Sequence, residues 1–188
     1  MGEKSSSEVL IPLDRVGALI GKKSATKREI ERKAKVKLKV DSETGAVTIV
    51  GEPENMLVGM EIVKAIGRGF SPKVALKLLK PDFILDVIDL TDEVSETQLN
   101  RVRGRLIGSK GKTREYISQL TDVDISVYGK TVSFIGTPEK VALAKRCMEM
   151  LISGAQHQTV YRFLEKEAKM LKEAELFDKF DDSSKVKI

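Results

Sequence analysis

Residues 103–114 read Arg103-Gly-Arg-Leu-Ile-Gly-Ser-Lys-Gly-Lys-Thr-Arg114. Gly108 and Gly111 bracket Ser109 and Lys110, and a pattern typical of a helix follows directly. Glycine has no Cβ, so the backbone can come close to a ligand at this point. The free N–H groups and the positive dipole end of the following helix would face the same point. The stretch therefore predicts a cradle for a phosphate backbone.

Basic residues gather around this loop. Between positions 101 and 115 the chain carries six Lys or Arg residues against one acidic residue, Glu115. The whole chain of 188 residues has 33 Lys and Arg against 28 Asp and Glu, a net charge of +5. An excess concentrated in one stretch favours a polyanionic partner. A solvated helix face would explain the same charges without any ligand.

Two interpretations of the loop compete. Gly111-Lys-Thr113 resembles the end of the nucleotide-binding pattern G-x-x-x-x-G-K-[ST]. That pattern requires a glycine where Leu106 stands, and a buried strand before it, whereas residues 101–107 read as a basic amphipathic helix. The other interpretation is a G-x-x-G loop that clamps single-stranded nucleic acid.

An internal repeat decides how the loop is built into the chain. Ile20-Gly21 aligns with Ile107-Gly108 at an offset of 107 − 20 = 87. After a turn, residues 47–51 align with residues 132–136 at an offset of 132 − 47 = 85, because the second turn is shorter. Each half therefore predicts the order strand, helix, helix, strand, strand, helix, with one further helix appended.

This order, with G-x-x-G between the first two helices, resembles the KH fold of the eukaryotic topology. The resemblance implies an α+β protein with two tandem eukaryotic-type (type I) KH domains. Each would be a three-stranded antiparallel sheet backed by helices, with one appended helix. We expect a flexible tail over residues 1–7, a first domain over 8–80, a second domain over 81–170 and a charged tail over 171–188.

The resemblance also implies a binding site for single-stranded RNA along the second loop and the neighbouring strand. Its expected residues are Arg103, Gly104, Arg105, Ile107, Gly108, Ser109, Lys110, Gly111, Lys112, Thr113, Arg114, Ile117, Ile125 and Val127. In the first domain Ser24 stands where the second has Gly111, so the backbone should approach RNA less closely there. We therefore expect a secondary site at Gly21, Lys22, Lys23, Ser24 and Lys27.

Four stretches are more specific than the KH fold in general. Residues 65–72, 83–90, 104–114 and 160–164 resemble the archaeal ribosome-assembly KH proteins, counterparts of the eukaryotic pre-rRNA processing factor called partner of Nob. The resemblance implies binding of the 3′ end of small-subunit rRNA, contact with the Nob endonuclease and contact with the α subunit of translation initiation factor two. The alternative is a general single-stranded nucleic-acid-binding or exosome-type KH protein.

Few residues offer catalytic or metal chemistry. His157 is the only histidine and Cys147 the only cysteine, so the sequence predicts no metal site and no intrachain disulfide. Asp86 and Asp89 lie three apart on a predicted strand and would point to opposite faces. We expect no enzyme activity, no cofactor, no membrane span and a cytoplasmic location. A degenerate nucleotide-binding enzyme is the alternative from another class.

Overall fold

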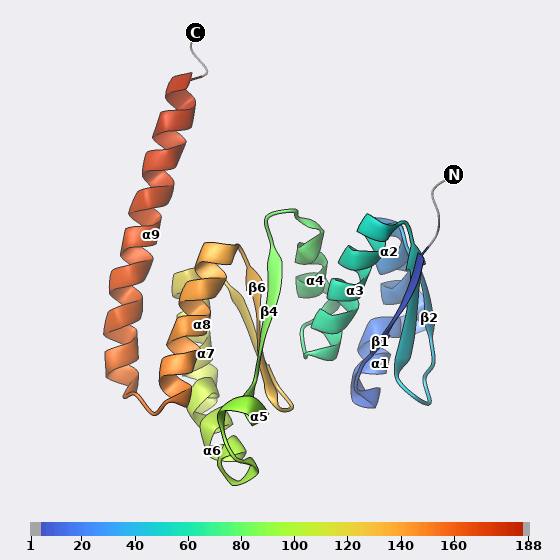
Figure 1. Cartoon of the computed structure of the whole chain (residues 1–188), viewed down its shortest axis with the longest axis horizontal. Coiled ribbons are helices and arrows are strands. Elements are labelled where there is room, and N and C mark those ends of the chain that lie inside the picture. Colours follow the sequence, from blue (N-terminus) through green and yellow to red (C-terminus); the bar gives the residue numbers. More distant parts are fainter. Residues whose placement is uncertain (1–4, 186–188) are drawn as a thin grey trace.

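The computed structural model describes the backbone of residues 5–185 and the side chains of residues 5–177. Two units with nearly the same element order follow one another along the chain (Figure 1). The first unit consists of β1 (Ser5–Leu10), α1 (Leu13–Ile20), η1 (Lys22–Ser24), α2 (Ala25–Ala34), β2 (Lys37–Val40), β3 (Ala46–Gly51), α3 (Pro53–Gly67), α4 (Pro72–Ala75) and η2 (Leu76–Leu79). The second consists of β4 (Ile84–Asp89), α5 (Leu90–Glu93), α6 (Glu96–Ile107), η3 (Ser109–Gly111), α7 (Lys112–Thr121), β5 (Asp124–Tyr128), β6 (Thr131–Gly136), α8 (Pro138–Ile152) and α9 (His157–Lys185). In these labels η marks a single 3-10 turn.

Each unit contains a three-stranded antiparallel sheet whose last strand lies in the middle. The strand orders are β1-β3-β2 and β4-β6-β5. The registers match as well, since Leu38 lies opposite Ile49 in the first sheet and Ile125 lies opposite Phe134 in the second. The predicted α+β architecture of two repeated domains is confirmed.

The two sheets differ in how many of their faces are covered. In β3 the buried residues alternate, with Val47 and Ile49 in the core and Thr48 and Val50 half-buried on the other face. In β6 all six residues are buried. Figure 1 shows the reason, because the second sheet packs on its own helices on one side and faces α3 and α4 of the first domain on the other. The outer face of the first sheet points away from the second domain.

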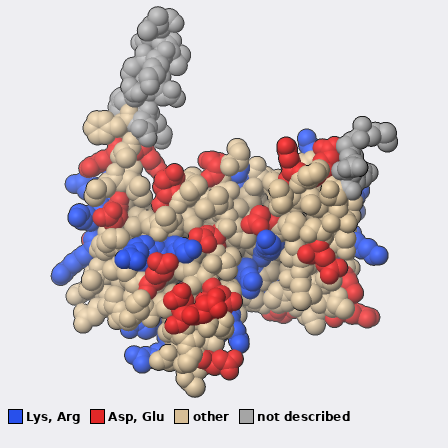
Figure 2. All heavy atoms as spheres, viewed as in Figure 1, with Lys and Arg blue, Asp and Glu red and all other residues tan. Residues whose placement is uncertain are grey.

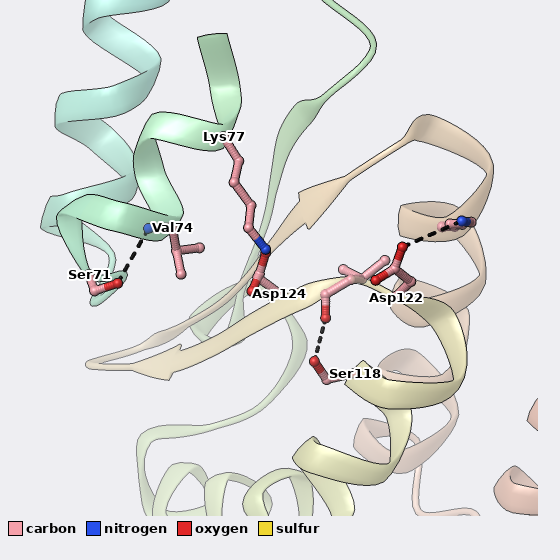
Figure 3. A network of polar contacts seen from close by, with 8 residues as sticks. Ser71, Val74, Lys77, Ser118, Asp122 and Asp124 are labelled. Atoms are coloured by element: carbon pink, nitrogen blue, oxygen red, sulfur yellow. Dashed lines mark hydrogen bonds and ion pairs between the residues drawn. The ribbon is translucent and has the colours of Figure 1, made fainter. Parts of the chain in front are cut away.

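Specific contacts join the domains at that second face. Ile135 of β6 is fully buried among the core residues of the first domain. Ser126 Oγ donates to the Arg68 carbonyl at 2.8 Å, and Lys77 Nζ lies 2.5 Å from a carboxylate oxygen of Asp124 (Figure 3). Apolar burial and polar contacts thus fix the second sheet on the helices of the first domain.

The ends of the chain differ from the prediction. The first strand begins at Ser5, so residues 5–7 belong to the sheet and the expected tail over 1–7 is too long; residues 1–4 lie outside the described residues. The expected boundary at residue 170 falls inside one continuous helix, α9, which runs to Lys185. No glycine or proline interrupts residues 157–185, and Lys140 Nζ on α8 pairs with Glu175 at 3.1 Å, so nothing ends the helix at the domain boundary.

Candidate nucleic-acid interface

The loop between α6 and α7 has a backbone conformation that depends on glycine. Gly108 has φ 73° and ψ 172°, Lys110 has φ 53° and Gly111 has φ 82°. A Cβ on Gly108 would lie 2.2 Å from Thr113 Oγ1, so no other residue fits there without displacing the start of α7. At Gly111 the nearest atoms to such a Cβ are 3.8 Å away, which leaves its surface open to a ligand.

The corresponding loop of the first domain has the same conformation despite its serine. Gly21 has φ 70° and ψ 173°, Lys23 has φ 51° and Ser24 has φ 61°. The replacement of the second glycine therefore leaves the path of the backbone unchanged. Ser24 does place a side chain on a residue in the left-handed conformation, which costs about 1 kcal/mol of folding free energy. Arg28 further covers this loop, since its guanidinium donates to the carbonyls of Ser24 at 3.3 Å and Lys23 at 2.5 Å.

The polar and basic side chains expected around the second loop divide into two groups. Ser109, Lys110 and Lys112 are exposed at the tip and the first turn of α7, while Arg103 and Arg114 are half-buried. The N-terminus of α7 adds its free N–H groups and its positive dipole end at the same place. Exposed ammonium groups next to open backbone donors form an arrangement that suits a phosphate group.

Arg105 does not belong to that exposed group. Its guanidinium donates to the carbonyl of Ala155 at 2.5 Å, and its own carbonyl lies 3.0 Å from His157 Nε2. Both contacts tie the end of α6 to the connection between α8 and α9. These contacts give Arg105 a structural role that holds the loop in place, and its contact with phosphate stays a prediction.

Three further residues expected at the site have buried side chains. Ile117 is fully buried, Thr113 is 3% exposed and Ile125 is 8% exposed, so their side chains form the core beneath the site instead of its surface. Ile107 and Val127 are half-buried and stay candidates for contact with a ligand. A small domain needs its apolar residues for its own core, which is why the apolar positions next to the loop face inward.

The sequence did not indicate that α9 supports the loop. Tyr161 on α9 lies 3.0 Å from Thr113, hydroxyl oxygen to hydroxyl oxygen, and its ring packs edge-on against Tyr116 with 4.7 Å between centroids. Tyr116 donates to Glu165 at 2.5 Å, and this hydrogen bond together with burial raises the pKa of the Tyr116 phenol. The tyrosines at positions 116 and 161 were the only sequence signal for this contact. They lie more than 40 residues apart in the chain, so no local pattern joins them.

Other surfaces offer no comparable chemistry in the described part of the chain. In Figure 2 acidic side chains gather over α5, where Asp92 and Glu93 lie, and basic residues alternate with acidic ones elsewhere on that face. No three His, Cys, Asp or Glu residues among residues 5–177 come together as metal ligands. Burial raises the pKa of the Cys147 thiol to about 12, so it stays protonated in the core at neutral pH. None of the helices described between residues 5 and 185 could span a bilayer.

Comparison with protein families identifies both halves. The KH domain model matches residues 6–65, and the model described as eukaryotic type KH-domain (KH-domain type I) matches residues 84–169. A KH domain-containing protein of Methanocaldococcus jannaschii is 46% identical over 191 residues, which cover 97% of this chain and 84% of that protein. The pre-rRNA-processing protein PNO1 of Chaetomium thermophilum is 31% identical over 124 residues, 64% of this chain but 48% of that protein. The chain thus aligns with about half the length of this eukaryotic relative.

Solved structures agree with these matches. Dim2p of Pyrococcus horikoshii is 46% identical with a TM-score of 0.82, and the match covers 86% of this chain and 99% of that one. A complex of a/eIF2alpha, aDim2p and rRNA from the same organism matches with a TM-score of 0.84 and 46% identity, over 88% of this chain and 95% of that one.

Proposed function

The chain belongs to the KH-domain family that includes archaeal Dim2p and eukaryotic PNO1, and we propose that it binds RNA during assembly of the small ribosomal subunit. The ligand would be single-stranded RNA at the 3′ end of small-subunit rRNA. Support comes from the relatives, one of which is named a pre-rRNA-processing protein and another solved in a complex with rRNA. The protein would act by binding and not by catalysis.

The loop of the second domain carries the proposal. Its open backbone at Gly111, its exposed Lys110 and the N-terminus of α7 converge on one point, and that combination suits a sugar-phosphate backbone. The first domain repeats the loop but adds the Ser24 side chain and the Arg28 guanidinium. We therefore place primary RNA binding in the second domain and a secondary or protein-contact role in the first.

The same relatives suggest protein partners. Dim2p of P. horikoshii was solved together with a/eIF2alpha, and we propose that this chain binds the corresponding α subunit of the initiation factor. Contact with the Nob endonuclease and a cytoplasmic location stay predictions.

A pair of charge reversals tests the function. Ser109→Asp with Lys110→Asp places two carboxylates against the phosphate position and should abolish binding of an oligonucleotide carrying the 3′ end of small-subunit rRNA. Lys22→Asp with Lys23→Asp is the matched control in the first domain and should weaken binding less. Equal losses of RNA affinity in the two variants would contradict the proposed difference between the domains. If the wild-type protein binds a scrambled oligonucleotide equally well, a general single-stranded nucleic-acid-binding or exosome-type protein is favoured.

A further inference from the structure

A carboxylate covers the edge of the first sheet. Glu31 on α2 accepts a hydrogen bond from the backbone N–H of Leu38 at 2.8 Å. β2 is the edge strand of its sheet, so this N–H points away from β3 and towards the groove beside α2. Glu31 also lines a hollow of about 580 Å³ together with Arg28 and Lys35. The backbone donor at Leu38 is therefore already occupied by the protein's own side chain.

The repeat makes the second domain a direct comparison. The N–H of Val36 donates to the Glu31 carbonyl at 3.2 Å, and the N–H of Val123 donates to the Ser118 carbonyl at the same 3.2 Å. Position 118 therefore corresponds to position 31, with 118 − 31 = 87. Ile125 corresponds to Leu38 and occupies the same register on the edge strand β5, so its N–H points outward in the same way.

The serine at position 118 does not supply an acceptor for that outward N–H. Ser118 Oγ donates to the Val123 carbonyl at 2.5 Å, before the strand begins (Figure 3). The serine oxygen is two bonds closer to its Cα than a glutamate oxygen is, and it bonds the Val123 carbonyl instead of a group on the strand. The position that holds a carboxylate in the first domain thus holds none in the second, and β5 lies against α6 and α7, the two helices that flank the loop.

An open edge of a strand binds extended ligands through its backbone groups. An unpaired base of single-stranded RNA offers carbonyl oxygens and ring nitrogens as acceptors. We propose that the residue at positions 31 and 118 determines which domain reads bases. Glu31 closes the edge of β2 and repels phosphates, whereas Ser118 leaves the Ile125 N–H free to donate to a base of bound RNA. This inference rests on the proposed RNA-binding function and adds its specificity-determining position.

Substitutions at position 118 of the full chain test it. Ser118→Gln introduces an uncharged acceptor that can reach the Ile125 N–H, and binding of the rRNA 3′-end oligonucleotide should weaken roughly tenfold, as for a lost hydrogen bond. Ser118→Glu should weaken it at least as much. Ser118→Ala is the matched control, since it offers no acceptor, and should bind like the wild type. Thermal melting of each variant separates loss of binding from loss of fold.

A second measurement needs no substitution in the second domain. In the wild-type protein the NMR signal of the Ile125 amide should shift when the oligonucleotide is added, while that of the Leu38 amide should not. Glu31→Ala should accelerate hydrogen exchange of the Leu38 amide. Glu31→Ser, added to the Ser109→Asp and Lys110→Asp variant, should restore part of the lost RNA binding through the first domain.

The outcomes separate the inference from the function on which it rests. If Ser118→Gln binds RNA like the wild type, or if the Ile125 amide is unmoved by bound RNA, position 118 does not govern base reading, although the protein still binds RNA. If the Ser109→Asp and Lys110→Asp variant binds as well as the wild type, the proposed site in the second domain itself is wrong.

Discussion

Thr113 on α7 and Tyr161 on α9 share a hydrogen bond of 3.0 Å between their hydroxyl oxygens. The same Thr113 oxygen is the atom that a side chain at Gly108 would meet at 2.2 Å. The threonine therefore joins the loop, at the position where only glycine fits, to α9, the helix appended after the long helix of the second domain. The C-terminal helix is in this way part of the support of the proposed site.

Removal of the Tyr161 hydroxyl should loosen that support. Tyr161→Phe keeps the ring against Tyr116 but leaves Thr113 without its partner, and we expect a loss of about 1 kcal/mol of unfolding free energy. Hydrogen exchange in residues 108–111 should become faster and RNA affinity should fall. Tyr116→Phe is the control, because its partner Glu165 is exposed. This substitution should change hydrogen exchange of the loop and RNA affinity little. Equal effects of the two substitutions on the loop would contradict the linkage.

The two glycines of the second loop should respond differently to a methyl group. Gly108→Ala forces Thr113 aside at a φ of 73° and should lower the unfolding free energy by about 3 kcal/mol. Gly111→Ala meets no close atom and should cost only about 1 kcal/mol, for the left-handed conformation. The second variant should stay folded in thermal melts but bind RNA more weakly. If Gly111→Ala binds like the wild type, the backbone at Gly111 is not the contact surface.

Gly69 and Gly154 occupy equivalent positions in the repeat and test the contact between domains. A Cβ on Gly69 would meet Ser126 Oγ at 2.7 Å and Tyr128 Cβ at 2.8 Å, whereas one on Gly154 would meet nothing within 4 Å. Gly69 has φ 95° and Gly154 has φ 97°, so the conformational cost of an alanine should be the same at both positions. Gly69→Ala should therefore destabilise the protein more than Gly154→Ala in urea titrations. Similar losses would mean that the domains can separate slightly at no cost.

Ile135 should matter only when both domains are present. It is fully buried among first-domain core residues, so Ile135→Thr in the full chain should lower the unfolding free energy by roughly 1–3 kcal/mol. In a fragment of residues 80–177 the same side chain would face water, and the substitution should leave stability unchanged while reducing aggregation. A full-length variant as stable as the wild type, by calorimetry, would contradict the interface.

Lys110 and Arg105 should separate ionic contact from structural support. Lys110→Ala should leave the melting temperature unchanged and reduce the salt dependence of RNA binding by roughly 0.7 in the log–log slope, as one phosphate contact to a single strand does. Arg105→Ala leaves the Ala155 carbonyl without its donor and should cost roughly 1–3 kcal/mol of stability. A change of salt slope for Arg105→Ala in a protein of unchanged melting temperature would support its expected phosphate contact.

The amino-acid sequence was sufficient for the features that depend on neighbouring residues. The alternation of residues 36–40 and 124–128 predicted strands, and the Gly-rich loops with their following helices predicted the repeat and its domain type. Such features are local, because the period of side chains along a strand or a helix follows from the backbone geometry of a few residues.

The tertiary structure decided which of the basic and apolar residues face the ligand. Arg105 looks like any other cation of its helix until the Ala155 carbonyl, 50 residues away, is seen beside it. Ile135 and Ile125 have the same strand pattern, yet one is buried by the first domain and the other by its own. Periodicity identifies a buried face but not the element that covers it, because that depends on contacts between residues distant in the chain.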